Sequence, residues 1–293
     1  MPAWQGKSKG SPLGYRIFVF ILRRGGVIPA YLLLRFVAFH YLLFSFKSTK
    51  STYHYFRHKL HYGLLKSISE IYRNYYVFGQ SIIDKVVILA NIPNKFTFNF
   101  DGRHNLLAIA DQKKGGLLLS AHIGNWEIAG HLLRHIDTKL NIVMFDGERE
   151  NIKQYIESVT GKMSVNIIVI KNDLSHIFEI SHALKNNELV CMHADRFVEG
   201  NKTITTKFLG DDAKFPLGPF LLAARFRVPV SFVFAMKETT FHYHFFASTP
   251  KNYLNLDRET GALQVLNDYV HEMEDKVKRY PEQWYNYYNF WQA

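Results

Sequence analysis

Cysteine is almost absent from this chain, since Cys191 is the single one among 293 residues. One thiol cannot build an intrachain disulfide framework or a cysteine-rich zinc module, so both are excluded, and such sparing use fits a reducing compartment. Internal repeats and low-complexity tracts are also missing. Hydrophobic residues make up 47% of the chain and aromatic residues 15%, which excludes a disordered chain and allows a sizeable core.

Acidic residues are missing from the first 69 positions, because Glu70 is the first acid in the chain. The same stretch carries eleven lysine and arginine residues, whereas the rest of the chain carries the other 25 basic residues and all 25 acidic ones. The formal net charge of +11 therefore comes entirely from the first quarter of the sequence. The remainder is an electrically balanced globular sequence.

The basic stretch is also apolar, with a long hydrophobic run at residues 27–46. Its length is about that needed to cross the hydrocarbon core of a bilayer. Arg35 lies near the middle, where inserting an arginine costs about 2.5–3.5 kcal/mol. A spanning helix, a re-entrant helix and an interfacial helix with Arg35 snorkelling to the headgroups therefore all stay open. Because flanking bases attract anionic lipids, we predict that residues 1–69 associate with the cytoplasmic face of a membrane.

Other interpretations of this segment are less well supported. A buried core helix with a solvated basic surface would give a similar composition. Nucleic-acid binding is disfavoured because the aromatic residues alternate with Leu, Val and Ile instead of standing alone on a basic face, and we expect no nucleic acid as a partner. A secretory signal peptide is disfavoured because the apolar run is long and interrupted, and no small-residue cleavage site follows it.

From about residue 84 onward, short apolar runs alternate with amphipathic stretches. Strands are predicted at residues 115–121, 140–145, 165–170, 188–193 and 229–235, with 241–247 returning beside the last one as a hairpin. Helices are predicted at residues 126–135, 148–159, 174–185, 219–226 and 257–279. This alternation predicts one α/β domain, residues 70–293, with a largely parallel central sheet flanked by helices.

The tip of one predicted strand carries the most reactive side chains. The strand at residues 115–121 leads directly into His122, and ligand sites of α/β sheets lie at the carboxyl ends of strands. Gly124 permits a tight turn, and Asn125 suits the N-cap of the next helix. Glu127 then falls in the first helical turn, where the helix dipole favours a carboxylate, and the turn can fold it toward the imidazole. A carboxylate on one ring nitrogen leaves the other as a base.

The segment SAHIGNWEIAG, residues 120–130, resembles the His-x4-Asp/Glu block of the lysophospholipid acyltransferase superfamily, and most of all its bacterial lipid A late (secondary) acyltransferase branch. Three further blocks are similar to that branch and stand in the same order: residues 193–200, residues 205–235 and the YPEQWYNYY segment at 280–288. The basic, hydrophobic N-terminus is similar to the membrane anchor of the branch. Leu209 departs from the pattern, because the branch often has a second Phe there.

The resemblance implies an enzyme of lipid biosynthesis. It would transfer a fatty acyl group from a thioester, carried by acyl carrier protein or coenzyme A, to a hydroxyl or amine of a lipid-like acceptor. The resemblance implies that His122 is the general base and that Glu127 orients its ring. The residues implied in binding substrate or the oxyanion are Gly124, Asn125, Arg196, Phe208, Gly210 and Gly218. No metal and no cofactor are expected, and the implied location is the cytoplasmic face of the bacterial inner membrane.

Two other functions are consistent with the residues alone. His122, His131 and His135 beside Glu127 supply the ligand types of a zinc-dependent hydrolase, although the H-E-x-x-H order is absent. A non-enzymatic membrane adaptor would explain the basic, apolar N-terminus. It would not explain the residues at the strand tip.

Overall fold

A seven-stranded sheet forms the centre of the computed structural model, which describes residues 12–133, 136, 138–145, 165–171, 173, 175–198, 200–254 and 256–292. The strand order is β1-β9-β8-β2-β5-β3-β4, and β6 and β7 form a separate two-stranded hairpin. The strands are β1 (Thr97–Asp101), β2 (Gly116–Ser120), β3 (Leu140–Phe145), β4 (Val165–Ile170), β5 (Leu189–His193), β6 (Thr203–Phe208), β7 (Asp211–Pro216), β8 (Val230–Thr239) and β9 (His242–Ala247).

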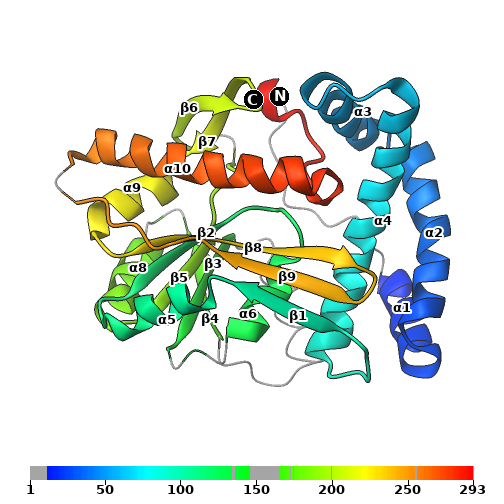
Figure 1. Ribbon diagram of the computed structural model, residues 1–293, viewed down its shortest axis with the longest axis horizontal. Helices are drawn as coiled ribbons and strands as arrows, with labels where there is room; N and C mark the ends of the chain where they lie inside the picture. The colour runs from blue at the N-terminus through cyan, green and yellow to red at the C-terminus, as the bar shows by residue number, and fades with distance from the viewer. Residues whose placement is uncertain are drawn as a thin grey trace.

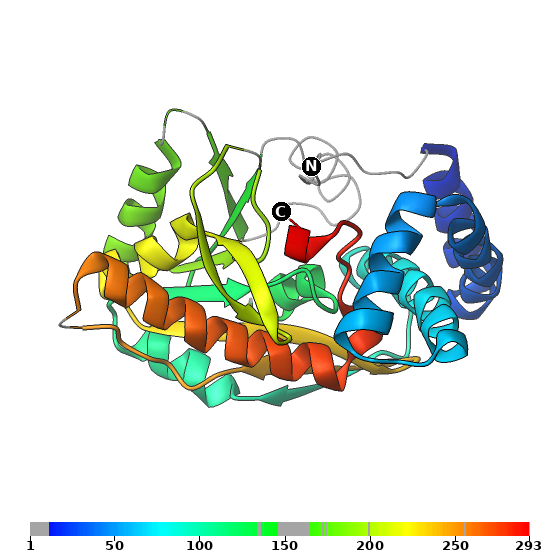
Figure 2. The ribbon, with the colours of Figure 1, turned by 90° about the horizontal axis from the view of Figure 1, so that it is seen from above.

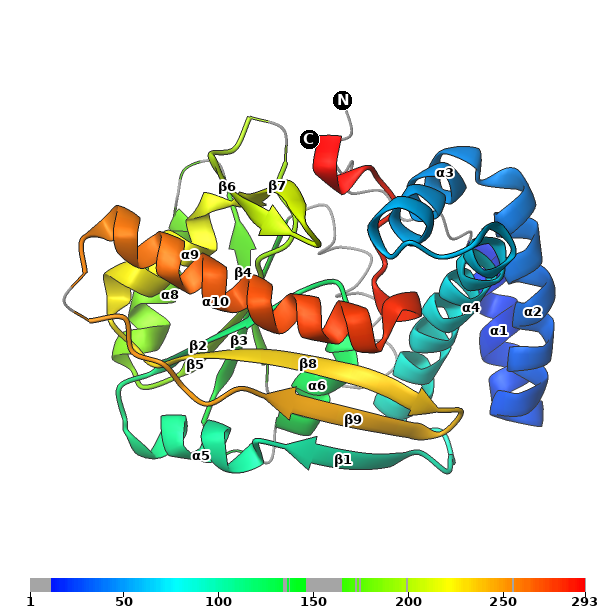
Figure 3. The same ribbon diagram turned by 45° about the horizontal axis from the view of Figure 1, so that its top comes forward.

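Helices cover both faces of the sheet and one of its ends. The α-helices are α1 (Pro12–Gly25), α2 (Val27–Phe44), α3 (Phe46–His54), α4 (Leu64–Leu89), α5 (Arg103–Asp111), α6 (Trp126–Leu133), α8 (Ser175–Lys185), α9 (Leu217–Phe226) and α10 (Arg258–Arg279). A π-helical turn, Tyr55–Lys59, continues α3, and 3-10 turns lie at Pro281–Gln283 and Phe290–Gln292. Helix α10 crosses one face of the sheet, α5 and α6 lie on the opposite side, and α2 and α4 stand at one end (Figure 1, Figure 3).

The α/β class predicted from the sequence is confirmed. Every neighbouring pair of strands in the central sheet is parallel except β8 and β9, which form the antiparallel hairpin that the sequence predicts at this place. The helix predicted at residues 148–159 lies outside the described residues. Strand β1, helix α5 and the β6–β7 hairpin are additions to the predicted elements.

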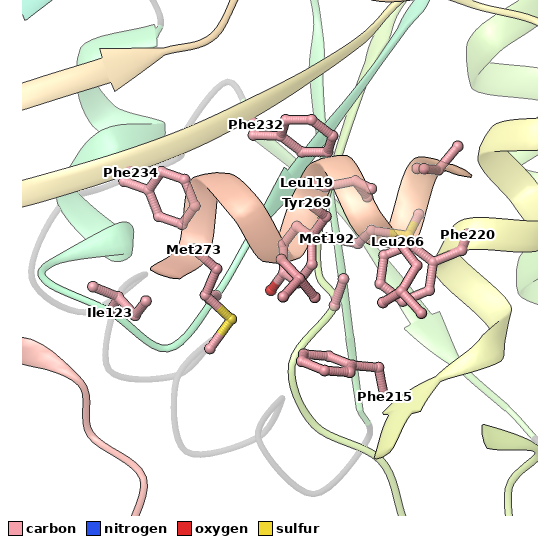
Figure 4. Packing of buried hydrophobic residues seen from close by; sticks show 14 of the residues in the cluster. Leu119, Ile123, Met192, Phe215, Phe220, Phe232, Phe234, Leu266, Tyr269 and Met273 are labelled. Carbon is pink, nitrogen blue, oxygen red and sulfur yellow. The ribbon is translucent and has the colours of Figure 1, made fainter. Parts of the chain in front are cut away.

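The two faces of β2 are covered by different helices. Leu117 and Leu119 belong to the main core, which includes Tyr269 of α10, whereas Leu118 packs in a second cluster with Ile109 of α5. Figure 4 shows Leu119 and Tyr269 within the same packed group of side chains. Burying each such side chain contributes about 1.5–3 kcal/mol. The sheet is thus fixed from both sides, and so are the ends of its strands.

The N-terminal helices gather on one side of the sheet (Figure 2). The buried face of α2 packs along α4 through residues at helical spacing: Val27, Ala30, Tyr31, Leu34 and Ala38. The opposite face of α2 exposes large apolar side chains: Ile28, Leu32, Phe36, Phe39, Leu43 and Phe44. Helix α4 runs across the domain boundary predicted between residues 69 and 70, so the two predicted parts share one continuous helix.

Candidate active site

Two parallel strands end side by side at the residues that form the site. In the β2–β5 pair Ser120 stands opposite His193, and the N–H of Ala194 donates to the carbonyl oxygen of Ser120 at 2.9 Å. His122 and Asp195 each lie two residues beyond these strand ends. The register of the sheet therefore brings an imidazole and a carboxylate together at the edge where ligand sites of α/β sheets lie.

Asp195 holds the imidazole of His122. The Nδ1 atom of His122 lies 2.7 Å from Oδ1 of Asp195, and the backbone N–H of His122 donates to Oδ2 at 3.0 Å. Both residues are buried. When the Nδ1 proton is donated to the carboxylate, the lone pair of Nε2 is left to accept a proton.

Glu127 does not orient the ring, and this corrects the expectation from the sequence. Its ion-pair partner in the described structure is Lys85 of α4, whose Nζ lies 2.7 Å from Oε2 of Glu127. Its position in the first turn of α6 does keep it near the site. The charge of Glu127 raises the pKa of His122, but less strongly than Asp195 does.

Burial sets the acid–base state of the pair. It lowers the pKa of His122, and the guanidinium of Arg196 lowers it further against the opposing effect of Asp195. Burial alone would raise the pKa of Asp195, but the interactions with His122 and Arg196 hold it well below its usual range. Near neutral pH the pair is therefore a neutral imidazole beside an ionised carboxylate, which is the state that a general base needs.

Aromatic rings pack around His122. The ring centroid of His193 lies 4.4 Å from that of His122, and the centroid of Trp126 lies 5.0 Å from it. Burial and the neighbouring His122 lower the pKa of His193 well below its usual value. His193 is therefore neutral near neutral pH, and it packs against His122 as an uncharged ring.

Backbone pairing braces the turn after His122. Gly124 has a φ of +64°, its N–H donates to the carbonyl oxygen of Gln283 at 2.9 Å, and a Cβ at this position would lie 2.1 Å from the carbonyl oxygen of Ala235. The N–H of Asn125 donates to that same Ala235 oxygen at 2.7 Å. Both N–H groups are thus used within the fold, where Gly124 and Asn125 shape the turn, and their expected part in binding substrate stays a prediction.

The Pro-x-Gln-Trp segment forms the other side of this turn. Trp284 makes an antiparallel bridge with Ile123, and the N–H of Tyr285 donates to the carbonyl oxygen of His122 at 3.1 Å. Asn74 of α4 donates from Nδ2 to the carbonyl oxygen of Trp284 at 3.0 Å. A segment far away in the sequence is thereby fixed beside the catalytic turn, which is the stretch from His122 to Glu127.

Arg196 reaches the same segment from the loop that follows β5. Its Nη2 atom donates to the carbonyl oxygen of Tyr285 at 2.6 Å. Its charge lowers the pKa of both His122 and Asp195. The structure therefore brings Arg196 to the site, together with an imidazole and two carboxylates.

A family model described as bacterial lipid A biosynthesis acyltransferase matches residues 71–292, which include both strand tips, the catalytic turn and the segment that braces it. The chain belongs to this family. It is therefore an acyltransferase of lipid biosynthesis that acts on lipid-like acceptors. Members of this family are bacterial and associate with membranes.

A distant likeness between the acyltransferase and a solved structure spans most of both chains. The crystal structure of the 1-acyl-sn-glycerophosphate (LPA) acyltransferase PlsC from Thermotoga maritima is 14% identical, covers 85% of this chain and 97% of its own, and gives a TM-score of 0.40. A comparison with curated proteins finds no match.

Membership in the family corrects two alternatives. The adaptor and the zinc-dependent hydrolase both give way to an acyltransferase. Of the proposed zinc ligands, His135 lies outside the described residues. Within the described ranges, no group of three or more His, Cys, Asp or Glu side chains is arranged to hold a metal ion.

The other three residues expected at the substrate site of the acyltransferase take packing and turn positions in the fold. Phe208 is fully buried, with the ring centroids of Phe215 and Trp284 at 6.0 and 5.4 Å. Gly210 lies in the turn between β6 and β7, and Gly218 is the second residue of α9. Their part in binding substrate stays a prediction.

Two side chains of nucleophile type serve packing in the acyltransferase. The Oγ atom of Ser120 donates to the carbonyl oxygen of Val233 at 2.7 Å. Burial raises the pKa of Cys191 to about 12. A thiol with such a pKa is scarcely ionised near neutral pH, so neither residue supports a covalent acyl-enzyme.

Proposed function

We propose that this acyltransferase moves a fatty acyl chain from a thioester, carried by acyl carrier protein or coenzyme A, to a hydroxyl or amine of its acceptor, with His122 as general base. The contact of 2.7 Å between Nδ1 of His122 and Oδ1 of Asp195 carries this proposal. It orients the ring and leaves Nε2 as the proton acceptor. Burial keeps that nitrogen unprotonated near neutral pH.

The reaction begins when Nε2 of His122 takes the proton from the O–H or N–H of the acceptor. The acceptor atom attacks the thioester carbonyl carbon, and the carbonyl oxygen becomes negative. When this intermediate collapses, the C–S bond breaks and the leaving thiolate takes the proton from His122. Asp195 stays ionised and stabilises the imidazolium between the two proton transfers. A positioned base of this kind accelerates a reaction about 10²–10⁴-fold.

Arg196 is the group proposed to stabilise negative charge on the thioester oxygen or on a phosphate of the donor. A guanidinium offers several N–H donors in a planar fork that suits such oxygens. The backbone N–H groups of Gly124 and Asn125 are left out of this role because they donate to carbonyl oxygens within the fold.

Residues 1–69 are proposed to meet the cytoplasmic face of the bacterial inner membrane. Within the described part of this segment, α2 is long and apolar enough to cross a bilayer. One face of α2 is buried against α4, however, and the other is exposed. A spanning α2 would draw charged side chains of α4, such as Arg73, into hydrocarbon, where each costs several kcal/mol. We therefore propose that α2 lies in the plane of one leaflet.

The charge of the N-terminal helices supports contact with an anionic lipid surface. The exposed basic residues in the described part of residues 1–69 are Arg23, Arg24, Arg35, Lys47, Lys50, Arg57 and Lys66. Each contributes about 1 kcal/mol of attraction when it lies near an anionic leaflet. The chain from residue 70 onward is proposed as the part that transfers the acyl group.

Release of free thiol from a fatty acyl thioester tests the chemistry. Dodecanoyl-acyl carrier protein and dodecanoyl-coenzyme A are supplied in lipid–detergent micelles, and we expect turnover of at least one. His122→Ala loses about 10²–10⁴-fold in rate with unchanged folding. His271→Ala, which alters an exposed histidine of α10, keeps the parent rate. Near-normal turnover in His122→Ala overturns the assignment of the base.

Comparative lipid mass spectrometry identifies the acceptor. A bacterial host that makes the parent chain is compared with one that makes His122→Ala. A lipid that gains one acyl chain in the first host alone is the acceptor. Identical lipid profiles, with both proteins present in equal amounts, contradict transfer to a lipid of that host.

A further inference from the structure

One turn of α4 holds the catalytic turn at two points. The carbonyl oxygen of Ser81 accepts a hydrogen bond from Nδ2 of Asn125 at 3.0 Å, and Nζ of Lys85 lies 2.7 Å from Oε2 of Glu127. Residues four apart lie on the same face of a helix, so one surface of α4 makes both contacts. The amide of Asn125, which the sequence suggests as a helix cap, is thus directed at α4 instead.

A buried ionic network fixes this turn of α4. Asp84 is fully buried and accepts hydrogen bonds from Nζ of Lys237 at 2.6 Å and from the hydroxyl of Tyr243 at 2.5 Å. That hydroxyl also accepts from Nδ2 of Asn125 at 3.2 Å. A buried charge with its partners in place is costly to disturb. The helical turn that carries Lys85 is therefore a rigid support.

The ion pair of Lys85 and Glu127 is largely shielded from solvent. Their side chains are 12% and 23% exposed. Salt and water screen a partly buried pair less than a surface pair. Because the cation of Lys85 lies beside Glu127, it offsets part of the negative charge that Glu127 places near the ring of His122.

The charged groups and histidines around His122 come from three elements: His193, Asp195 and Arg196 of β5 and its following loop, Glu127 of α6, and Lys85 of α4 behind it. The C-terminal segment adds Tyr285, a tyrosine whose pKa is raised by burial and which therefore stays neutral. Two carboxylates are thus balanced by two cations, and His193 is held neutral by burial. Removing Lys85 leaves excess negative charge beside the ring, which favours the imidazolium.

We propose that Lys85 is a positioning residue for acyl transfer: it fixes the carboxylate of Glu127 beside His122 and balances its charge, so that the base stays neutral. The inference rests on the proposed function of His122. Lys85 itself need not touch the substrate, because it acts through Glu127.

Lys85→Met removes the cation and keeps an apolar side chain of similar length. We expect kcat for thiol release, with the dodecanoyl thioester that the parent cleaves faster, to fall about tenfold with little change in KM. We expect the acid limb of the kcat/KM profile to move about half a pH unit upward. Lys85→Arg keeps the charge and recovers most of both properties. Lys251→Met alters a lysine that pairs with Asp268 at 3.2 Å on the surface, and it changes neither property.

A second pair of variants separates charge balance from a general loosening of the fold. Glu127→Gln moves the acid limb to lower pH, because the carboxylate that favoured the imidazolium is gone. The double variant with Lys85→Met returns the limb close to its parent position. A purely structural role of Lys85 would lower thermal stability without these opposite shifts. Lys85→Gln provides the same measurement if Lys85→Met does not fold.

The outcomes distinguish this inference from the function on which it rests. A parent-like rate and acid limb in Lys85→Met or Lys85→Gln overturn the inference, while an inactive His122→Ala still supports the base. An active His122→Ala overturns the proposed function, and the inference falls with it. Opposite limb shifts for Lys85→Met and Glu127→Gln, with His122→Ala inactive, support both.

Discussion

The sheet and the N-terminal helices place their apolar side chains in opposite ways. The strand β2 is buried along its whole length and packs against helices on both faces. The helix α2 buries one face only, and Phe36 on the other face is 75% exposed. A row of exposed large apolar side chains is unusual on a protein surrounded by water alone. This contrast fits our proposal that the sheet part of the protein lies in water and that the N-terminal helices contact lipid.

Charge separates the two halves in the same way. The sheet half is balanced, and its site depends on a few buried charges at short distance, whereas the helical half carries no acid before Glu70. Helix α4 belongs to both, because it packs against α2 on one side and holds the catalytic turn on the other. The side chains proposed to contact the membrane differ from those proposed for catalysis, so a substitution can impair one function and leave the other unchanged.

The largest expected effect lies in the sheet half, with Asp195→Asn. An amide cannot stabilise the imidazolium as a carboxylate does, and its N–H groups can reverse which ring nitrogen carries the proton. We expect kcat for thiol release to fall about 10³-fold, with vesicle binding unchanged. Asp212→Asn changes an exposed aspartate of β7 and leaves both unchanged. A variant at position 195 that keeps a tenth of the parent kcat would contradict the role of Asp195.

Gly124→Ala tests how tightly the catalytic turn is closed. The added Cβ would lie 2.1 Å from the carbonyl oxygen of Ala235 at a φ of +64°. We expect the free energy of unfolding to fall by about 2–4 kcal/mol, measured by denaturant titration in detergent. Gly26→Ala in the helical half has a φ of +79° and a ψ of −165° but open space around it, and it costs about 1–3 kcal/mol. Equal losses at the two glycines would argue against the tight approach.

The double variant Phe36→Ser, Phe39→Ser tests the membrane contact of the N-terminal helices. Both side chains belong to the exposed face of α2, so we expect binding to vesicles with anionic lipid to weaken about tenfold or more. Thiol release in detergent stays at the parent rate. Phe178→Ser on α8 removes a side chain that is 78% exposed in the sheet half, and it leaves vesicle binding as it was. Equal losses in both proteins would mean that exposed phenylalanine anywhere promotes binding.

The smallest effect is one of pH. Burial and Arg196 lower the pKa of His122, so the acid limb of the kcat/KM profile lies below the usual histidine value of about 6.5. The lowered pKa values also make the free energy of unfolding depend on pH. Unfolded imidazoles bind protons below about pH 6.5 whereas buried His122 and His193 resist them, so the melting temperature falls as the pH drops below that value. An acid limb above pH 6.5 would contradict a buried neutral base.

Local sequence patterns predict the inner strands of the fold well. Strands β2, β3 and β5 are short, largely apolar runs, which are typical of parallel strands inside a covered sheet. The hairpin of β6 and β7 escapes this rule because polar side chains occupy much of it, as in TITTKF and DDAKFP. Strand β1 alternates exposed and half-buried residues at the sheet edge, so its apolar signal is weak as well.

The candidate site could be predicted only in part. His122 follows from inspection of strand tips, and the same inspection of β5 would have pointed to Asp195 two residues beyond its end. That β5 lies beside β2 is a property of the strand order, which local sequence does not reveal. Lys85 comes from a helix well before the catalytic turn, and its pairing with Glu127 depends on how α4 packs. Contacts between distant segments are therefore what the sequence analysis missed.

The pairing of residues 283–285 with the catalytic turn has a consequence for biosynthesis. Those residues are translated after every strand of the sheet, so the nascent chain displays His122 long before its brace exists. Until residues 283–285 join the fold, the N–H of Gly124 lacks the carbonyl oxygen of Gln283 as its hydrogen-bond partner. The turn that carries His122 is therefore completed only after the last strand of the sheet has been synthesised.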